Sequence, residues 1–393
     1  MINAVIVNAK RTPVGSFQGE LSSLSAPELG ARVIQNILST TSISHDIIDE
    51  VILGNVLSSG IGQAPARQAA INGGLLNTVE CLTINKMCGS GLKAVMLGEQ
   101  AMKTGDADVV LAGGMESMTN APYLLPKARA GFRLGHAKMI DSIIHDGLWD
   151  AYNNMHMGNC AELCARDRNY SREGQDAFAI ESYERAQKAT ENGWFNDEIV
   201  PINISMRRGD DLTISRDEEP TRAKFEKIPN LRPAFEKEGT ITAANASKIN
   251  DGAATVLMMS ETRAHELGLK PLVTIIGHAS AAHEPEWFTT APGKAINKVL
   301  DKTGLSANDI DLWEINEAFA PVTMAAMDDF NLPKDKVNIH GGAIAIGHPI
   351  GASGARILTT LIHAMRRIDA RKGLATLCIG GGEASAIIVE ALW

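Results

Sequence analysis

The sequence predicts an α/β protein made of two similar halves with a long insertion between them. Short β-branched runs alternate with helix-period segments, which is typical of a sheet covered by helices on both faces. Several motifs occur twice in the same order, and residues 120–248 fit neither copy. We therefore expect an N-terminal half of residues 1–119 plus 249–269, a loop domain of residues 120–248, and a C-terminal half of residues 270–393.

Six short β-branched runs are the expected strands, and the motifs around them recur. The offset between copies is nearly constant, because 316 − 55 = 261 and 354 − 91 = 263. A repeat of this length indicates a duplicated domain, since solenoid repeats span only about 20 to 50 residues. The runs are residues 4–7, 51–53, 109–111, 273–276, 311–315 and 374–379, and the paired motifs are residues 5–13 with 273–285, 49–55 with 311–316, 88–91 with 351–354, and 110–117 with 377–385.

Composition excludes several classes of protein. The 393 residues include 37 Lys plus Arg and 46 Asp plus Glu, so a net charge of 37 − 46 = −9 disfavours nucleic-acid binding. Five cysteines are too few for a disulfide scaffold, and their odd number leaves a free thiol, which indicates a reducing compartment. No run approaches 18 apolar residues and no leader pattern precedes the first strand, so we expect a cytoplasmic protein without membrane contact.

Cys88 is the first candidate for chemistry. It follows the end of an expected strand and precedes Gly89-Ser90-Gly91, which opens a helix-forming run. The free N–H groups and the positive dipole end at a helix start favour a thiolate. The position suits a nucleophile, and a packed core cysteine is the alternative.

His348 lies in the glycine-dense segment 341–354. So many glycines are not chosen for packing volume or helix propensity, so the backbone there must pass close to another group. A histidine held on such a turn, next to Pro349, suits a general base. The alternative is a structural turn.

Two further strand ends carry polar side chains. Cys378 ends an apolar strand and is followed by Gly380 and two more glycines, whose N–H groups can point at an oxyanion. Asn316 follows another strand end, where its amide can position water or donate to an oxyanion. Buried packing is the alternative for Cys378.

The spacing of His156, Cys160 and Cys164 raises the question of a metal site. Residues at i, i+4 and i+8 line one helix face over about 12 Å, so they cannot converge on one ion. No metal site is predicted.

Taken together, the motifs resemble those of the thiolases, and of the acetyl-CoA acetyltransferases in particular. The resemblance covers essentially the whole chain. It implies a βαβαβαββ unit in each half, with two central sheets and helices between and outside them. It also implies a ping-pong Claisen condensation of two acetyl-CoA into acetoacetyl-CoA plus CoA, and the reverse thiolysis, with no cofactor besides these substrates. The motifs are residues 85–91, 316–320, 341–354 and 378–382.

The resemblance assigns a role to each catalytic candidate. It implies that Cys88 carries the acyl group, that His348 activates this cysteine, and that Cys378 takes a proton from the α-carbon of the second acetyl-CoA. Asn316 would orient a water in one oxyanion hole beside His348. The N–H groups of Cys88 and Gly380 would form the other hole.

The resemblance also implies contacts with CoA and between subunits. Arg222 is placed near the CoA phosphates, and segment 123–139, which mixes apolar with basic residues, looks like an arm of a homotetramer. The remaining expected CoA contacts are Leu148, His156, Met157, Ser247 and Phe319.

Three other functions stay open at this point. A broader-chain degradative 3-ketoacyl-CoA thiolase would share the motifs. A β-ketoacyl synthase would typically carry a second histidine in place of Asn316 and would not need Cys378. A non-catalytic acyl-CoA-binding relative should have lost Cys88, His348 or Cys378, and all three are present.

Overall fold

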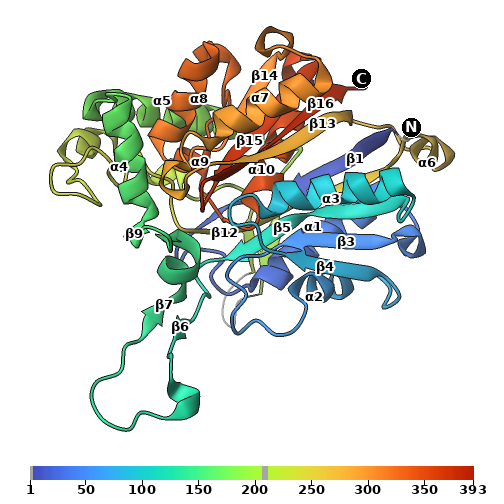
Figure 1. The fold of residues 1–393 in the computed structure, drawn as a ribbon. Helices are drawn as coiled ribbons and strands as arrows, with labels where there is room; N and C mark the ends of the chain where they lie inside the picture. Colours follow the sequence, from blue (N-terminus) through green and yellow to red (C-terminus); the bar gives the residue numbers. More distant parts are fainter. Residues whose placement is uncertain (1–2, 206–210) are drawn as a thin grey trace.

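The computed structural model describes residues 3–205 and 211–393, so residues 206–210 of the predicted loop domain lie outside it. All six predicted strands are present, within β1, β3, β5, β13, β14 and β15 (Figure 1). Of the remaining strands of the main sheet, β4 corresponds to the strand expected before Cys88, and β2, β12 and β16 were not predicted. The sheet consists of β1 (Ala4–Arg11), β2 (Gly15–Ser16), β3 (Glu50–Gly54), β4 (Glu80–Ile84), β5 (Val109–Ser117), β12 (Asn250–Ser260), β13 (Val273–Ala282), β14 (Leu312–Ile315), β15 (Lys372–Ile379) and β16 (Glu383–Ala391).

The two halves meet in the middle of one continuous sheet. Its strand order is β14-β15-β16-β13-β1-β12-β5-β3-β4, with β2 on β12. At the seam, β1 and β13 pair antiparallel only through Val5 with Thr274 and Ile6 with Val273. Outward from this seam β12, β5 and β3 mirror β16, β15 and β14, which confirms the duplicated α/β fold. The two sheets implied by the resemblance are thus joined by one short pairing.

One of the repeated motif pairs is not structurally equivalent. β3 pairs in parallel with β5 through Glu50 and Val110, and β14 pairs in parallel with β15 through Leu312 and Gly373. When Glu50 is matched to Leu312, the equivalent positions in β5 and β15 lie 373 − 110 = 263 apart. The motif match of 110–117 with 377–385 requires 377 − 110 = 267, so this match is wrong by four residues. Its glycines lie inside β5 in one half and in the turn after β15 in the other.

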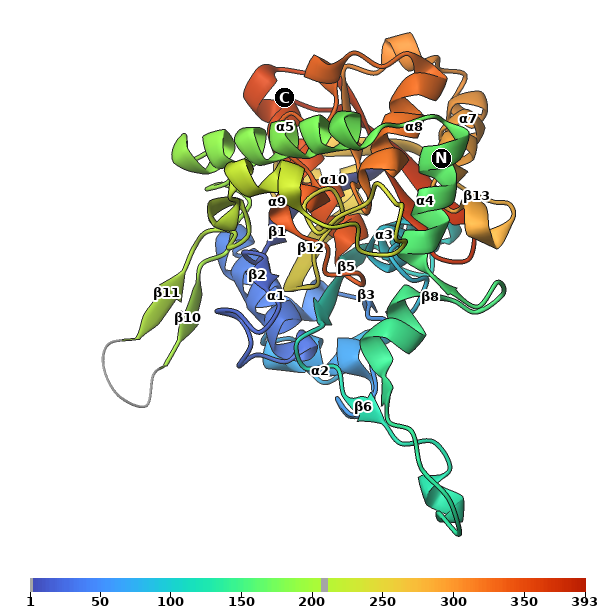
Figure 2. The same ribbon diagram turned by 90° about the vertical axis from the view of Figure 1, so that its left-hand side faces the viewer.

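Helices form layers inside and outside the two halves (Figure 2). α3 (Ser90–Thr104) and α10 (Ser353–Ile368) pack against each other between the halves, in a core that draws on both. α1 packs on the outer face of the N-terminal half beside α2, and α7 packs on the outer face of the C-terminal half beside α8. These outer helices are α1 (Ala26–Thr41), α2 (Pro65–Asn72), α7 (Ala291–Thr303) and α8 (Ala320–Phe330).

The starts of α3 and α10 touch through two glycines. A Cβ on Gly91 would lie 2.8 Å from the backbone nitrogen of Ala355, and a Cβ on Gly354 would lie 2.3 Å from that of Leu92. Any larger residue would push the two helices apart. Gly91 and Gly354 are equivalent in the repeat, so each half contributes the same element to this contact.

The insertion consists of hairpins and helices around one end of the sheet. The hairpin of β6 (Tyr123–Leu124) and β7 (Ile140–Asp141) carries the segment between them far from the body of the molecule (Figures 1 and 2). The other elements outside the main sheet are a π-helical turn (Ile143–Leu148), β8 (Trp149–Asp150), β9 (Met155–His156), α4 (Met157–Asp167), α5 (Arg172–Glu191), β10 (Ile202–Ile204), β11 (Leu212–Ile214), α6 (Glu261–Glu266) and α9 (Ala343–Ile346).

Candidate active site

A cavity of about 520 Å³ brings together nine of the eleven predicted site residues. This volume is within the range of small-molecule sites. Most of its other lining is apolar, including Phe235 and Phe288. The nine residues are Cys88, Leu148, His156, Met157, Arg222, Ser247, Phe319, His348 and Gly380.

Cys88 lies two residues before the first residue of α3, where the chain turns sharply. Met87 before it has φ 47°, and Gly89 after it leaves room for Ile379, whose side chain would lie 2.3 Å from an added Cβ. The backbone N–H groups of Gly380 and of Cys88 itself lie near the sulfur and favour its charged form. Groups from both halves of the chain therefore surround one thiol.

The expected bias of Cys88 toward thiolate does not hold in the free protein. Burial raises the pKa of its thiol to about 11, although the two N–H donors lower it, and the carboxylate of Glu116 raises it further. The side chain is nevertheless partly accessible at the cavity wall. Because the helix start is outweighed by burial, this thiol needs a base before it can act as a nucleophile.

His348 is buried at the cavity wall, and its backbone is tied down. Its backbone N–H donates to Asn250 Oδ1 at 2.9 Å, and its Nδ1 lies 2.7 Å from Ser353 Oγ. The preceding Gly347 has φ 120°, and a Cβ there would lie 2.6 Å from the Asn250 side chain. Burial, and then the charge of Arg356, lowers the pKa of the His348 imidazole to about 3. The ring is therefore neutral near pH 7 and can accept a proton.

Asn316 and Cys378 lie behind the cavity wall rather than in its lining. Asn316 follows β14 as expected, and its Nδ2 lies 3.4 Å from His348 Nδ1. Cys378 is fully buried in β15, in an apolar cluster with the cavity residues Met157 and Phe319. Burial, followed by the charge of Cys88, raises the pKa of the Cys378 thiol well above its ordinary value.

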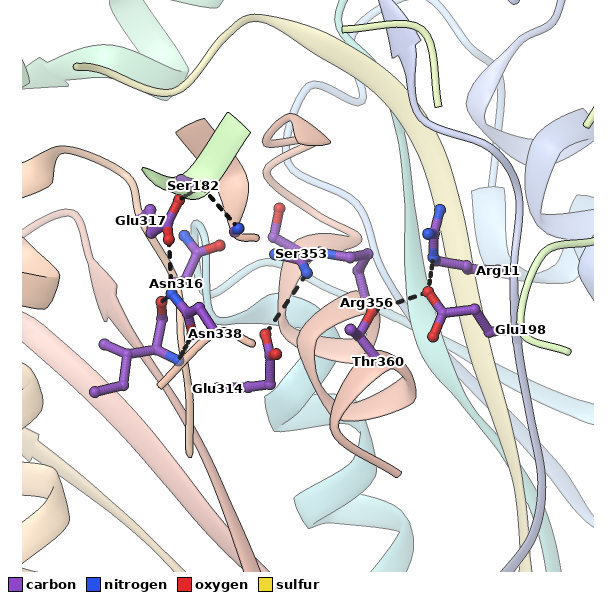
Figure 3. A network of polar contacts seen from close by, with 12 residues as sticks. Arg11, Ser182, Glu198, Glu314, Asn316, Glu317, Asn338, Ser353, Arg356 and Thr360 are labelled. Carbon is purple, nitrogen blue, oxygen red and sulfur yellow. Dashed lines mark hydrogen bonds and ion pairs between the residues drawn. The ribbon is translucent and has the colours of Figure 1, made fainter. Parts of the chain in front are cut away.

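Two buried carboxylates that sequence reasoning missed hold the His348 loop at both ends. Glu116 accepts from the backbone N–H of Gly351 at 2.9 Å, and Glu317 accepts from that of Ile344 at 3.2 Å. Glu317 also accepts from Ser182 and Asn338 at 2.7 and 2.8 Å (Figure 3). Burial raises the pKa of both carboxyl groups, that of Glu116 to about 7. The histidine is therefore carried on a loop with little freedom to move.

The CoA candidates surround the cavity from the insertion and from the end of β14. His156 precedes α4, accepts from the Gly158 N–H at 3.0 Å and stacks on Phe235 with ring centroids 4.8 Å apart. Arg222 forms an ion pair with Glu218 at 2.9 Å. It also lines a neighbouring cavity of about 220 Å³ together with Lys224 and Lys227. No periodic pattern in the sequence could have marked Phe235 or these two lysines.

Sequence comparison matches both halves of the chain to one family. Residues 4–262 match the thiolase N-terminal domain and residues 269–391 match the thiolase C-terminal domain. The chain belongs to the thiolase family.

Relatives that match this thiolase along nearly their full length are named acetyl-CoA acetyltransferases. It is 52% identical to an acetyl-CoA acetyltransferase of Pseudomonas aeruginosa, over 98% of this chain and 99% of the relative. It is 47% identical to one of Schizosaccharomyces pombe, over 98% of each. The solved structure of the Bacillus anthracis acetyl-CoA acetyltransferase superposes with a TM-score of 0.97, at 41% identity, over 100% of this chain and 99% of that one. The Acat5 thiolase of Ascaris suum, solved with coenzyme A, gives 0.94 at 44% identity over 99% and 100%.

Membership of the thiolase family excludes one of the three alternatives, the β-ketoacyl synthase. Within residues 3–205 and 211–393 no group of three or more His, Cys, Asp or Glu side chains is arranged to hold a metal ion. In the same residues no helix has the length and apolar character needed to span a membrane. All five cysteines of this thiolase are free thiols.

Proposed function

We propose that this thiolase is an acetyl-CoA C-acetyltransferase, which condenses two acetyl-CoA into acetoacetyl-CoA and CoA and catalyses the reverse thiolysis. The observation that carries the proposal is the surroundings of Cys88. The backbone N–H groups of Gly380 and Cys88 lie near its sulfur, a neutral buried imidazole shares its cavity, and the rest of the cavity is largely apolar. A thioester needs these features to be attacked and held.

In the first half-reaction Cys88 attacks the acetyl-CoA carbonyl. With a pKa of about 11, only about one thiol in ten thousand is ionised at pH 7, so the proton has to leave as the sulfur attacks. His348 takes this proton. The Cys88 sulfur bonds to the acetyl carbon, the bond from that carbon to the CoA sulfur breaks, and CoA leaves with the proton from His348. Asn316 supports a water beside His348 that stabilises charge on a substrate oxygen.

In the second half-reaction Cys378 acts as the base. Its thiolate removes a proton from the α-carbon of the second acetyl-CoA, and this carbon attacks the acetyl group on Cys88. The new carbon–carbon bond forms as the bond to Cys88 breaks, and the proton taken up by Cys378 passes to the released Cys88 sulfur. The N–H groups of Cys88 and Gly380 stabilise the thioester oxygen. Burial is the main cause of the raised pKa of the Cys378 thiol.

The bound CoA would extend from Cys88 toward the basic neighbouring cavity. Leu148, His156, Met157 and Ser247 would line its pantetheine arm, and Phe319 would close the acyl end. Arg222 would meet the phosphates, and its position between the two cavities supports this assignment. Glu218 neutralises part of its charge, so Lys224 and Lys227 would share the role.

A chain-length profile of thiolysis tests this function. We expect the highest kcat/KM with acetoacetyl-CoA, because aromatic side chains of Phe235, Phe288 and Phe319 crowd the cavity. Rates would be measured with 3-ketoacyl-CoA substrates from C4 to C16. Equal or higher kcat/KM on C10 to C16 substrates would instead identify a broader-chain degradative thiolase, and no thiolysis of any of them would reject the proposal.

We also propose that the enzyme is a homotetramer joined through the β6–β7 hairpin. Side chains on this projecting segment are unusually exposed for apolar residues, with Leu134 101%, Met139 72% and Tyr123 64% accessible. Exposed apolar clusters of this kind mark protein interfaces.

Sedimentation of hairpin variants tests the assembly. The wild-type protein should sediment as about four copies of the 42.0 kDa chain, whereas Leu134→Asp combined with Met139→Asp should give smaller species, because buried carboxylates oppose the contact. Leu212→Asp, on the β10–β11 hairpin, is the matched control and should sediment like wild type. A single 42.0 kDa species for the wild type at micromolar concentration would refute the tetramer.

The predicted division of the chain also suggests a division of roles. We propose that residues 120–248 form a loop domain that supplies most of the CoA contacts, while residues 1–119 plus 249–269 supply Cys88 and residues 270–393 supply the remaining catalytic groups. We further propose a cytoplasmic location, because five free thiols suit a reducing compartment.

A further inference from the structure

The imidazole of His348 has a different environment at each ring nitrogen. Nδ1 lies 2.7 Å from Ser353 Oγ. Nε2 is buried and has no hydrogen-bond partner among the residues that the structure describes, and the residue lines the cavity that holds Cys88. A neutral imidazole carries one N–H, so the proton can be on only one of these nitrogens.

The hydroxyl of Ser353 has a second contact, and this contact determines whether the hydroxyl donates to or accepts from the His348 ring. Its oxygen lies 2.8 Å from the carbonyl oxygen of Pro349, which can only accept. The single hydroxyl proton of Ser353 is therefore donated to the carbonyl oxygen of Pro349. The Ser353 oxygen is left as an acceptor toward His348 Nδ1.

The equivalent serine in the other half of the repeat also lies between a backbone carbonyl and a nitrogen. Ser90 opens α3 as Ser353 opens α10. Ser90 Oγ donates to the carbonyl of Met87 at 2.7 Å and accepts the backbone N–H of Lys86 at 2.8 Å. The group on Lys86 can only donate, so the roles of the Ser90 hydroxyl are unambiguous. The same roles at Ser353 require an N–H on His348 Nδ1.

We propose that Ser353 is a positioning residue that keeps the proton of His348 on Nδ1 and thereby leaves Nε2 free to accept the proton of Cys88. The inference rests on the proposed role of His348 as the base. The other polar neighbour of Nδ1 is the Asn316 amide, whose Nδ2 lies 3.4 Å away and can only donate. Without the Ser353 hydroxyl this amide favours the opposite tautomer, in which Nε2 carries the proton and cannot act as a base.

Single-turnover acetylation of Cys88 by acetyl-CoA measures the effect of Ser353. Ser353→Ala should lower the acetylation rate by about 10²-fold or more, since general-base catalysis contributes that much, with the Kd for acetyl-CoA unchanged. Ser353→Thr keeps the hydroxyl and should restore most of the rate. Thr360→Val is the matched control, because Thr360 also has a buried hydroxyl on α10, bonded at 3.1 Å to Glu198. It should acetylate Cys88 like wild type.

Nitrogen-15 NMR of labelled histidines reads the tautomer directly and needs no substrate. Subtracting the spectrum of His348→Gln assigns the His348 signals. The wild type should show a protonated Nδ1 and an unprotonated Nε2, and Ser353→Ala should show the reverse.

Two results would overturn the proposal: a protonated Nε2 in the wild type, or near wild-type acetylation by Ser353→Ala. If Ser353→Ala does not fold, the wild-type spectrum still decides. If wild-type Cys88 takes no acetyl group at all, the proposed function fails, and the spectra alone decide the role of Ser353.

Discussion

A Cys88→Ala variant should lose condensation and thiolysis by a factor on the order of 10⁴ or more, because no other group can carry the acetyl intermediate. The fold should persist, since the side chain is only partly buried and faces the cavity. After incubation with acetyl-CoA, intact mass spectrometry should show one acetyl group on the wild type and none on the variant. Peptide mapping should place the wild-type acetyl group on Cys88.

Cys81→Ala is the matched control for this experiment. Cys81 is a free thiol of similar accessibility on the neighbouring strand β4, outside the cavity lining. This variant should be acetylated on Cys88 and retain its activity. An acetyl group that maps to Cys378 in the wild type would reverse the roles assigned to the two cysteines.

A Cys378→Ser variant should separate the two half-reactions. Acetylation of Cys88 should stay within a few-fold of wild type, because that step uses Cys88, His348 and the two N–H donors. Condensation, and exchange of the α-hydrogens of acetyl-CoA with deuterated solvent, should fall by about 10² to 10⁴, since a hydroxyl ionises far less readily than a thiol. Acyl-enzyme mass and deuterium incorporation would be measured on the same preparation.

Cys160→Ser controls for the polarity of a buried hydroxyl. Cys160 is fully buried in the same apolar cluster as Cys378, so any loss from polarity alone should appear in both variants. Only Cys378→Ser should lose α-hydrogen exchange. Near wild-type condensation by Cys378→Ser would show that Cys378 only packs, and His348 would become the leading candidate for the second base.

The residues that the sequence singled out are those whose local chemistry is unusual. A cysteine before a helix start and a histidine among glycines each conflict with ordinary packing, and the structure places Cys88 and His348 on one cavity. The strand end at Asn316 was likewise visible, because an apolar run stops there. Such signals are local in the sequence, so no knowledge of the fold is needed to find them.

Other features depend on contacts between distant segments. The helix start near Cys88 suggested a thiolate, but the burial that raises its pKa comes from the packing of both halves. Glu116 lies 235 residues from Gly351, the loop residue that it binds. The glycines of 110–117 and 377–385 look alike, yet strand register separates them. The role proposed for Ser353 depends on side-chain contacts with His348 and Pro349 that no sequence pattern marks.

The reciprocal glycine contact between α3 and α10 has a consequence for how this site could specialise. Two separate copies of one half, meeting through this contact, would form a symmetric dimer in which every substitution appears twice. Covalent linkage removes that constraint. At the common offset of 263, Cys88 is opposite Gly351 and His348 is opposite Asn85. The proposed nucleophile and its proposed base thus occupy non-equivalent places in the two copies, an asymmetry that a homodimer of halves cannot adopt.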